Sequence, residues 1–540
     1  MTSLSTLLML FAATGVVLTI FTYMARKTEH VFWSFLQHFC GVWFVFSGLV
    51  KAVDPIGTAY KMEDYFVQFE STFAGLTNFF SGLAPLFPLL SKYSIGFSIF
   101  MVVLEIVLGV MLMLGHSRKL TAWLFFLIVV FFTVLTGFTY LTGYVPTEAN
   151  FFDFAKWGPY IKTQMRVTDC GCFGDFIKLD PRISFFKDLG LMVPAVLFLL
   201  RSKFMHQLFS DRWRSGLVLG TTAVSLLFCY RNTYWDLPVV DFRPFAIGTN
   251  VREKKAIEEE ARGNVEITGW ILENEKTGQI VTFNEPEPGK ITYYKQYAKT
   301  DGWKVKEQIK TEPYIVQVRG YELFNPNGQQ TVTVEMTDTA AIFKQYPESA
   351  GWQLRKEIGD KVPVKETKVS DFAVEGPSGE VTEDILNEEG YSLMIVAYHF
   401  EGEKKTETYV VQDTTWAVDT VQVTKDSISL QRRVASVEPK TLQRVTFTPD
   451  PEWEKIWREK INPFAEAAEK AGWKVYAITT YADAEAVPDF RHDVQAAYPF
   501  YKADDKLLKT IIRSNPGVVI WKDGTVVDMY HHRKLPGFEA

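Results

Sequence analysis

The chain has 540 residues, with 57 Lys and Arg against 63 Asp and Glu and a formal net charge of −6. This length is too great for one ordinary domain, so about three or four are expected. The first 235 residues carry 18 Lys and Arg against 13 Asp and Glu, whereas the remaining 305 carry 39 against 50. The split predicts a membrane half and an acidic soluble half. Without a basic stripe in the soluble half, nucleic-acid binding is excluded.

Six apolar stretches predict membrane-spanning helices, because about 20 mostly apolar residues cross a bilayer. They cover about 3–24, 32–50, 95–115, 120–143, 183–200 and 215–230. The first has no basic residue ahead of it and no small-residue cleavage site, which predicts a retained span rather than a signal peptide. A further apolar stretch, 72–91, contains Pro85 and Pro88 and predicts a re-entrant or interfacial segment.

Basic residues occupy alternate short loops: after the first span, after the third, and between the fifth and sixth. They are Arg26, Lys27, Arg118, Lys119, Arg201, Lys203, Arg212 and Arg214. Because cytoplasmic loops carry the Lys and Arg excess, these loops are predicted to be cytoplasmic. The N-terminus, the loops 51–94 and 144–182, and everything after about 231 are then predicted to lie on the outer side.

Two ionisable residues stand out in the spans. Glu105 lies in the middle of the third predicted span, where a carboxylate is costly unless it is paired, protonated or facing a polar cavity. It predicts a proton or cofactor site, and the alternative is a packing contact with a neighbouring helix. Lys51, at the outer end of the second span, is a candidate partner, and its alternative is a lysine that reaches the interface.

The four cysteines are Cys40, Cys170, Cys172 and Cys229. Cys170 and Cys172 fall in a predicted outer loop and are separated by one glycine, a pattern that suits redox chemistry or a metal. A disulfide closing so small a ring would be strained, and strained disulfides are labile and oxidising. The alternative is a structural disulfide, for example to Cys229. No further Cys or His stands nearby at ligand spacing, so no metal site is predicted.

These features resemble a known membrane family. The run Gly48–Pro55, followed by Glu105 and Gly109, resembles the DoxX-type family, and Cys-Gly-Cys-Phe-Gly at 170–174 is similar to its MauE branch. The resemblance covers about 30–200 and implies a four-helix core in a bacterial inner membrane. It further implies thiol oxidation or quinone-linked electron transfer, with Cys170 and Cys172 reacting and Glu105 and Lys51 near a quinone.

An internal repeat follows a predicted linker at 236–263. Lys295-Gln-Tyr297 and Gly302-Trp303 match Lys344-Gln-Tyr346 and Gly351-Trp352 at an offset of 49 residues. Short alternating stretches with turn residues between them predict hairpins. Residues 264–366 are therefore predicted to form two tandem β-rich modules of about 50 residues each.

Residues 367–540 alternate predicted strands and helices, which favours an α/β sandwich. This part resembles a thioredoxin-like domain, with Pro516 at the place of that fold's cis-proline. A polar β-like insert at about 401–450 stands where the resemblance places Cys-x-x-Cys, and the domain has no cysteine. Dithiol exchange by this domain is thus excluded, and it is expected to bind partners. His531 and His532 are interpreted as exposed imidazoles.

Two functions remain open from the sequence. The first is a membrane thiol-disulfide oxidoreductase on the periplasmic side, whose soluble domain docks an exported client or a separate thioredoxin-like protein. The second is a non-enzymatic envelope scaffold whose cysteines only stabilise the bundle. A small-molecule transporter is weaker, since it rests on Glu105 alone and no inverted repeat is visible.

Overall fold

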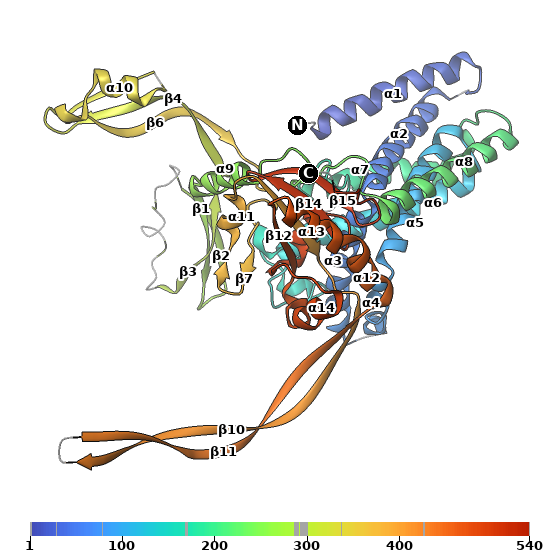
Figure 1. Ribbon diagram of the computed structural model, residues 1–540. Helices are drawn as coiled ribbons and strands as arrows, with labels where there is room; N and C mark the ends of the chain where they lie inside the picture. Colours follow the sequence, from blue (N-terminus) through green and yellow to red (C-terminus); the bar gives the residue numbers. More distant parts are fainter. Residues whose placement is uncertain are drawn as a thin grey trace. The chain divides into compact units, whose positions relative to one another are not determined.

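The computed structural model describes residues 3–28, 30–77, 79–167, 171–285, 291, 297, 301–335, 337–424 and 427–538. For residues 420–424, 427–429, 431, 443 and 444 it describes the backbone alone. The chain forms two compact units (Figure 1). The first comprises 1–246 with 253–370, and the second comprises 247–252 with 371–540. We describe each unit by itself.

The first unit begins with a set of long helices, coloured blue to green in Figure 1. They are α1 (Leu4–Met24), α2 (Val31–Val53), α3 (Pro55–Ala74), α5 (Ser94–Leu114), α6 (Arg118–Leu141), α7 (Pro181–Arg201) and α8 (Asp211–Tyr230). Among the described residues, five helical segments are long and apolar enough to cross a membrane: α1, α2, α5, α6 extended to Tyr144, and α7 extended to Phe204. The chain is therefore a multi-pass membrane protein.

Two apolar stretches differ from regular spans. The sixth predicted span, 215–230, forms helix α8, which lies outside the set of five. Glycine, serine and threonine dilute its apolar residues, and Arg214 precedes them, so its hydropathy is lower. The stretch 72–91 is broken into the end of α3, a 3₁₀ turn (Phe79–Leu83) and the start of α4 (Leu86–Lys92).

The helices α2 and α5 approach each other at three glycines. A Cβ atom at Gly41 would lie 2.8 Å from the Gly109 carbonyl oxygen, and one at Gly109 would lie 2.7 Å from the Gly41 carbonyl oxygen. A Cβ atom at Gly48 would lie 2.6 Å from Cγ1 of Ile106. Helices in membranes associate closely where small residues meet. This contact brings the C-terminal half of α2 against the middle of α5.

The rest of the first unit carries two separate three-stranded antiparallel sheets. One has the order β2-β1-β3 and the other the order β5-β4-β6. The strands are β1 (Ile267–Asn274), β2 (Ile280–Asn284), β3 (Trp303–Lys310), β4 (Tyr314–Asn325), β5 (Gln330–Val334) and β6 (Gln353–Pro363), with α10 (Thr339–Gln345) before β6. The segment predicted as a linker contains helix α9 (Val251–Gly263).

The same aromatic contact recurs in both sheets. The rings of Tyr297 and Trp303 have centroids 5.0 Å apart at an interplanar angle of 70°. The rings of Tyr346 and Trp352 are 5.1 Å apart at the same angle. These pairs stand at the sequence offset of 49 residues, so the repeated residues occupy equivalent environments.

The second unit is built on a seven-stranded sheet with the order β15-β14-β9-β12-β13-β7-β8. Strands β9, β12 and β13 are parallel, whereas β14 is antiparallel to β9 and to β15. The strands are β7 (Glu375–Gly376), β8 (Gly379–Glu380), β9 (Tyr391–Ala397), β12 (Lys474–Thr480), β13 (Phe500–Ala503), β14 (Gly517–Lys522) and β15 (Thr525–His531). The helices are α11 (Thr382–Leu386), α12 (Pro451–Ile456), α13 (Asn462–Lys470), α14 (Val487–Val494) and α15 (Asp505–Ile511).

The predicted insert at 401–450 forms a single long ribbon. Strands β10 (Gly402–Thr424) and β11 (Ser427–Pro449) pair only with each other among the described strands. The ribbon leaves the seven-stranded sheet after β9 and returns before α12. The peptide bond between Asn515 and Pro516, just before β14, is cis.

The interpretation of His531 and His532 as exposed imidazoles is wrong. Both are buried, and the Ser514 hydroxyl lies 3.1 Å from Nδ1 of His532. Burial lowers the pKa of His531 to about 3 and that of His532 to about 4. The polar sequence at the end of β15 predicts exposure. It does not show that the two rings are buried in the fold.

An aromatic cluster fills one side of the seven-stranded sheet. The Phe490 ring is fully buried, and its centroid lies 4.4 Å from that of Phe400, 4.8 Å from that of Trp453 and 5.0 Å from that of Trp457. These residues come from α14, the segment that follows β9, and the helical segment at 451–461. Phe490 therefore joins helices and sheet into one core.

We expect Phe490→Ala to lower the free energy of unfolding of the second unit by about 3–5 kcal/mol, because it leaves a cavity among rings that cannot close around it. Denaturant unfolding followed by tryptophan fluorescence measures the change, since Trp453 and Trp457 border the cavity. The control is Tyr481→Ala, which truncates a ring that is 54% exposed. A loss for Phe490→Ala no larger than for the control would contradict the assignment of this core.

Candidate functional site

The centre of the helical part holds a buried ion pair. Nζ of Lys51, on α2, lies 2.7 Å from Oε2 of Glu105, on α5, and the two side chains are only 7% and 4% exposed. The Lys51 ammonium group also lies 4.6 Å from the centroid of the Phe132 ring, on α6. The structure thus brings together the two residues predicted as cofactor-binding. Each neutralises the charge of the other inside an apolar bundle.

A second charged pair lies on α7. The Lys187 ammonium group contacts the carboxylate of Asp188, and both are buried. The Thr136 hydroxyl, on α6, donates a hydrogen bond of 2.9 Å to Oδ2 of Asp188. Lys51, Glu105, Lys187 and Asp188 all line one cavity, so the two pairs form one group of four charges.

Sequence reasoning missed Lys187 and Asp188. The signal was present, because two adjacent charged residues interrupt the apolar stretch 183–200, and intramembrane charges are costly unless they pair. The stretch was counted as a span by its average hydropathy, which hides a single charged position.

The cysteine loop meets this group near the C-terminal end of α2. The backbone turns sharply at Gly171 and Gly174, whose φ angles of 59° and 52° are left-handed. The Ser47 hydroxyl, on α2, donates a hydrogen bond of 3.1 Å to the Cys172 carbonyl. The Phe173 side chain is buried in the bundle core. The loop is therefore fixed against α2 at Cys172. Cys170 lies outside the described residues.

Cys172 and the four charges line one small cavity. Its walls include Ser47, Lys51, Glu105, Thr136, Cys172, Lys187 and Asp188. Its volume is about 40 Å³, enough for about three water molecules, since one needs roughly 10–15 Å³. The Lys187 ammonium group interacts electrostatically with Cys172. A positive charge next to a cysteine favours the thiolate, which is the nucleophilic form.

A larger cavity lies on the other side of Lys187. It has a volume of about 1,330 Å³ and is lined by parts of α1, α2, α6 and α7. Trp43, Lys187 and Leu191 line both cavities, so they form the wall between them. Most of the lining is apolar, and Tyr140, Tyr144, Tyr160 and Arg182 add polar groups. Such a cavity suits an amphiphilic ligand of membrane origin.

The two other cysteines lie away from this site. Cys40 on α2 and Cys229 on α8 are free thiols, and both are completely buried. Cys229 packs against Ala52, Val102 and Ile106. A Cys229 disulfide, considered as a structural alternative, is not formed. Both thiols act as small apolar core residues here.

In comparisons with known proteins, no family model, no curated protein and no solved structure matches the chain. The site is therefore interpreted from its own geometry. That geometry combines a fixed cysteine with an ammonium group and buried carboxylates that line the same cavity.

We expect Lys51→Met and Glu105→Met each to lower the free energy of unfolding by about 3–5 kcal/mol, because either change leaves one uncompensated buried charge. The double variant is expected to recover most of this loss, since two apolar side chains of similar volume replace the pair. Equilibrium unfolding in mixed micelles completes the double-mutant cycle.

The exposed pair Lys156 and Asp153, 3.2 Å apart with side chains 66% and 46% exposed, provides the matched control. Its single Met variants should each change stability by less than about 0.5–1 kcal/mol. Additive losses in the Lys51/Glu105 double variant would show that the two charges do not compensate each other.

Proposed function

We propose that this protein is a membrane thiol-disulfide oxidoreductase that acts through Cys170 and Cys172 on the periplasmic side of a bacterial inner membrane. The observation that carries the proposal is that the Lys187 ammonium group, which contacts Asp188, lines the same small cavity as Cys172. Burying an ammonium group in an apolar bundle is costly. A positive charge near Cys172 favours its reactive thiolate form.

The proposed reaction oxidises an exported client. A client thiolate attacks the sulfur of Cys170 in the Cys170–Cys172 disulfide, and Cys172 leaves as a thiolate stabilised by Lys187. A second client thiolate attacks the mixed disulfide, which releases Cys170 and leaves a disulfide in the client. The client has then lost two electrons and two protons. A low-energy thiolate leaving group accelerates such exchange.

The reduced pair passes its two electrons to a quinone, which takes up two protons to become a quinol. The cavity beside Cys172 is too small for a quinone ring at about 40 Å³, so the ring is proposed to occupy the larger cavity beyond Lys187. Lys187 borders both spaces. Glu105 and Asp188 are proposed to carry the protons, with Lys51 and Lys187 balancing their charge.

The membrane arrangement follows the DoxX and MauE resemblance and the basic loops. In this proposal α8 is a sixth span, which places the loop at 201–214 in the cytoplasm and the C-terminal part in the periplasm. The helices α2, α5, α6 and α7 form the four-helix core that contains the site.

The second unit is proposed to be a thioredoxin-like domain that docks the client or a separate thioredoxin-like protein. The strand order β12-β9-β14-β15 supports this proposal. Since the domain has no cysteine, it contributes binding alone.

Mixed-disulfide trapping tests the proposed function. In cells quenched with acid, we expect Cys172→Ala to accumulate a covalent adduct through Cys170. The Cys170 thiolate attacks the disulfide of an oxidised client, in the reverse of the proposed reaction, and Cys172 is absent and does not resolve the mixed disulfide. The adduct should be absent from Cys170→Ala and from the double variant. Non-reducing gels and mass spectrometry identify it. The absence of any adduct, with both single variants fully functional, would favour the envelope scaffold.

The role of Lys187 gives a separate prediction. In a Cys170→Ala background, we expect Lys187→Met to slow alkylation of Cys172 at neutral pH by about ten-fold, because the nearby positive charge is lost. Iodoacetamide labelling of the peptide that contains Cys172 measures the rate. Lys178→Met is the control, because Lys178 lies in the same loop and pairs with Asp175 at 3.5 Å. Equal alkylation rates for the Lys187→Met and Lys178→Met variants would show that Lys187 does not activate Cys172.

A further inference from the structure

The ribbon β10–β11 has two chemically different faces. Each strand has 23 residues, and the register pairs Gly402 with Pro449 at the base. Side chains alternate between the faces along a strand, and directly paired residues share a face. Among the described side chains of the ribbon, six exposed large apolar residues fall on one face. They are Val410, Trp416, Val418, Leu430, Val434 and Val437, which are 46–71% exposed.

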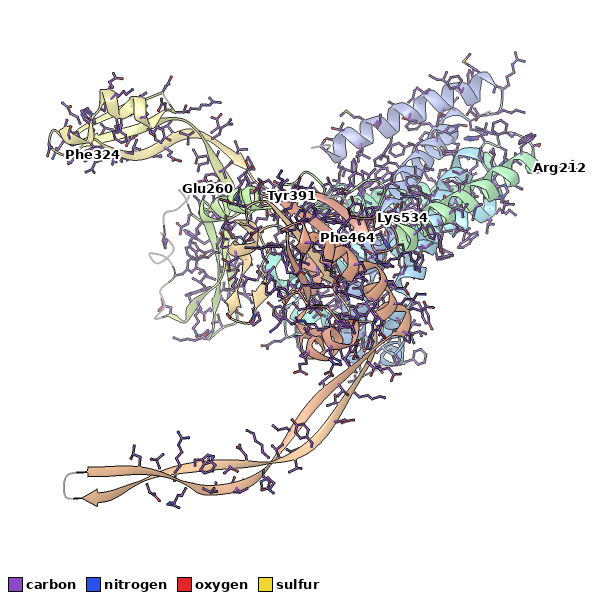
Figure 2. All side chains as sticks on the ribbon, viewed as in Figure 1. Arg212, Glu260, Phe324, Tyr391, Phe464 and Lys534 are labelled. Carbon is purple, nitrogen blue, oxygen red and sulfur yellow. The ribbon has the colours of Figure 1, made fainter. Side chains whose placement is uncertain are left out.

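The register gathers these six residues into one strip. Trp416 pairs with Val434, and Thr414 pairs with Val437. The strip runs from Val410 to the pair of Thr420 and Leu430, a length of about 33 Å at 3.3 Å per residue. Figure 2 shows side chains standing out from both sides of the ribbon.

The opposite face is polar and carries two ion pairs. Lys440 lies 3.5 Å from Asp413, and Arg433 lies 2.5 Å from Asp419. The Thr415 and Ser436 hydroxyl groups are 2.5 Å apart. Tyr409 is the one large exposed apolar residue among the described side chains of this face. The polar face therefore needs no partner, whereas the apolar face leaves a strip in water.

A ribbon of two strands is marginally stable by itself, because it buries almost no apolar surface. Three or more strands, or a second packed layer, are needed for a stable structure. Six exposed apolar side chains offer on the order of 600 Å², at the upper limit of what a monomer leaves in water. Such a surface indicates an interface.

We propose that the apolar face of the β10–β11 ribbon packs against the same face of a second copy of this chain. Arg432, opposite Val418, is the one charged residue of the strip among the described side chains, so the strip is apolar enough to pair with a copy of itself. Two such faces would bury about 1,200 Å², where specific interfaces begin. Two ribbons packed about 10 Å apart form a four-stranded sandwich, with a two-fold axis relating the copies.

The membrane favours this partner over a soluble protein. Copies anchored in one bilayer share an orientation and are held in two dimensions, which raises their effective concentration. A modest interface is then sufficient for pairing. The proposal concerns the ribbon alone and does not depend on the cysteine chemistry.

The test compares two matched variants of the full-length protein. Trp416→Lys/Val434→Glu replaces a directly paired couple on the apolar face with opposite charges, so the ribbon keeps a favourable cross-strand pair. Thr415→Lys/Ser436→Glu makes the same change on the polar face. Light scattering in detergent micelles measures the number of copies per particle. We expect two copies for the wild type and the polar-face variant, and one for the apolar-face variant.

Cysteine cross-linking locates the contact. In a Cys170→Ala/Cys172→Ala background, Thr414→Cys is expected to give a disulfide-linked dimer in membranes under mild oxidation, whereas Thr415→Cys on the opposite face is not. A wild type with one copy per particle would overturn the proposal. So would a dimer that survives the apolar-face change, or a different protein cross-linked at Thr414→Cys.

Discussion

Charge neutrality inside an apolar bundle is the constraint on which the rest of the membrane part depends. Lys51 and Glu105 meet at 2.7 Å, and Lys187 contacts Asp188, so four buried charges sum to zero. Removing ions from water costs several kcal/mol each, which only close pairing offsets. Helices α2, α5 and α7 must therefore keep fixed positions relative to one another. A site that needs such compensation is retained for chemistry more readily than for packing.

The glycines make this pairing feasible. Gly41, Gly48 and Gly109 let α2 and α5 approach until a Cβ atom would collide with backbone or side-chain atoms. The close approach sets the register in which Lys51 faces Glu105. Ser47, one turn before Lys51, then holds the Cys172 carbonyl. One helix contact thus fixes both the ion pair and the base of the cysteine loop.

The sequence predicted features that depend on local patterns and missed those that depend on packing. Five spans, the broken stretch 72–91 and the pairing of Lys51 with Glu105 followed from hydropathy and the cost of a buried charge. Lys187 was hidden by the average hydropathy of its span. The burial of His531 also escaped, because tertiary neighbours decide it. The β-like insert at 401–450 was predicted, but its form as one long two-stranded ribbon was not, because that form depends on the pairing of distant residues.

The distribution of the cysteines restricts any thiol exchange to the first unit. All four cysteines lie in the first 229 residues, so the second unit has no thiol with which to exchange electrons. This unit exposes the apolar face of β10–β11, whereas its aromatic core around Phe490 is buried. In the proposed dimer, the ribbon gains its second layer only from another molecule, so its order depends on assembly. Assembly would also bring two membrane sites into one particle.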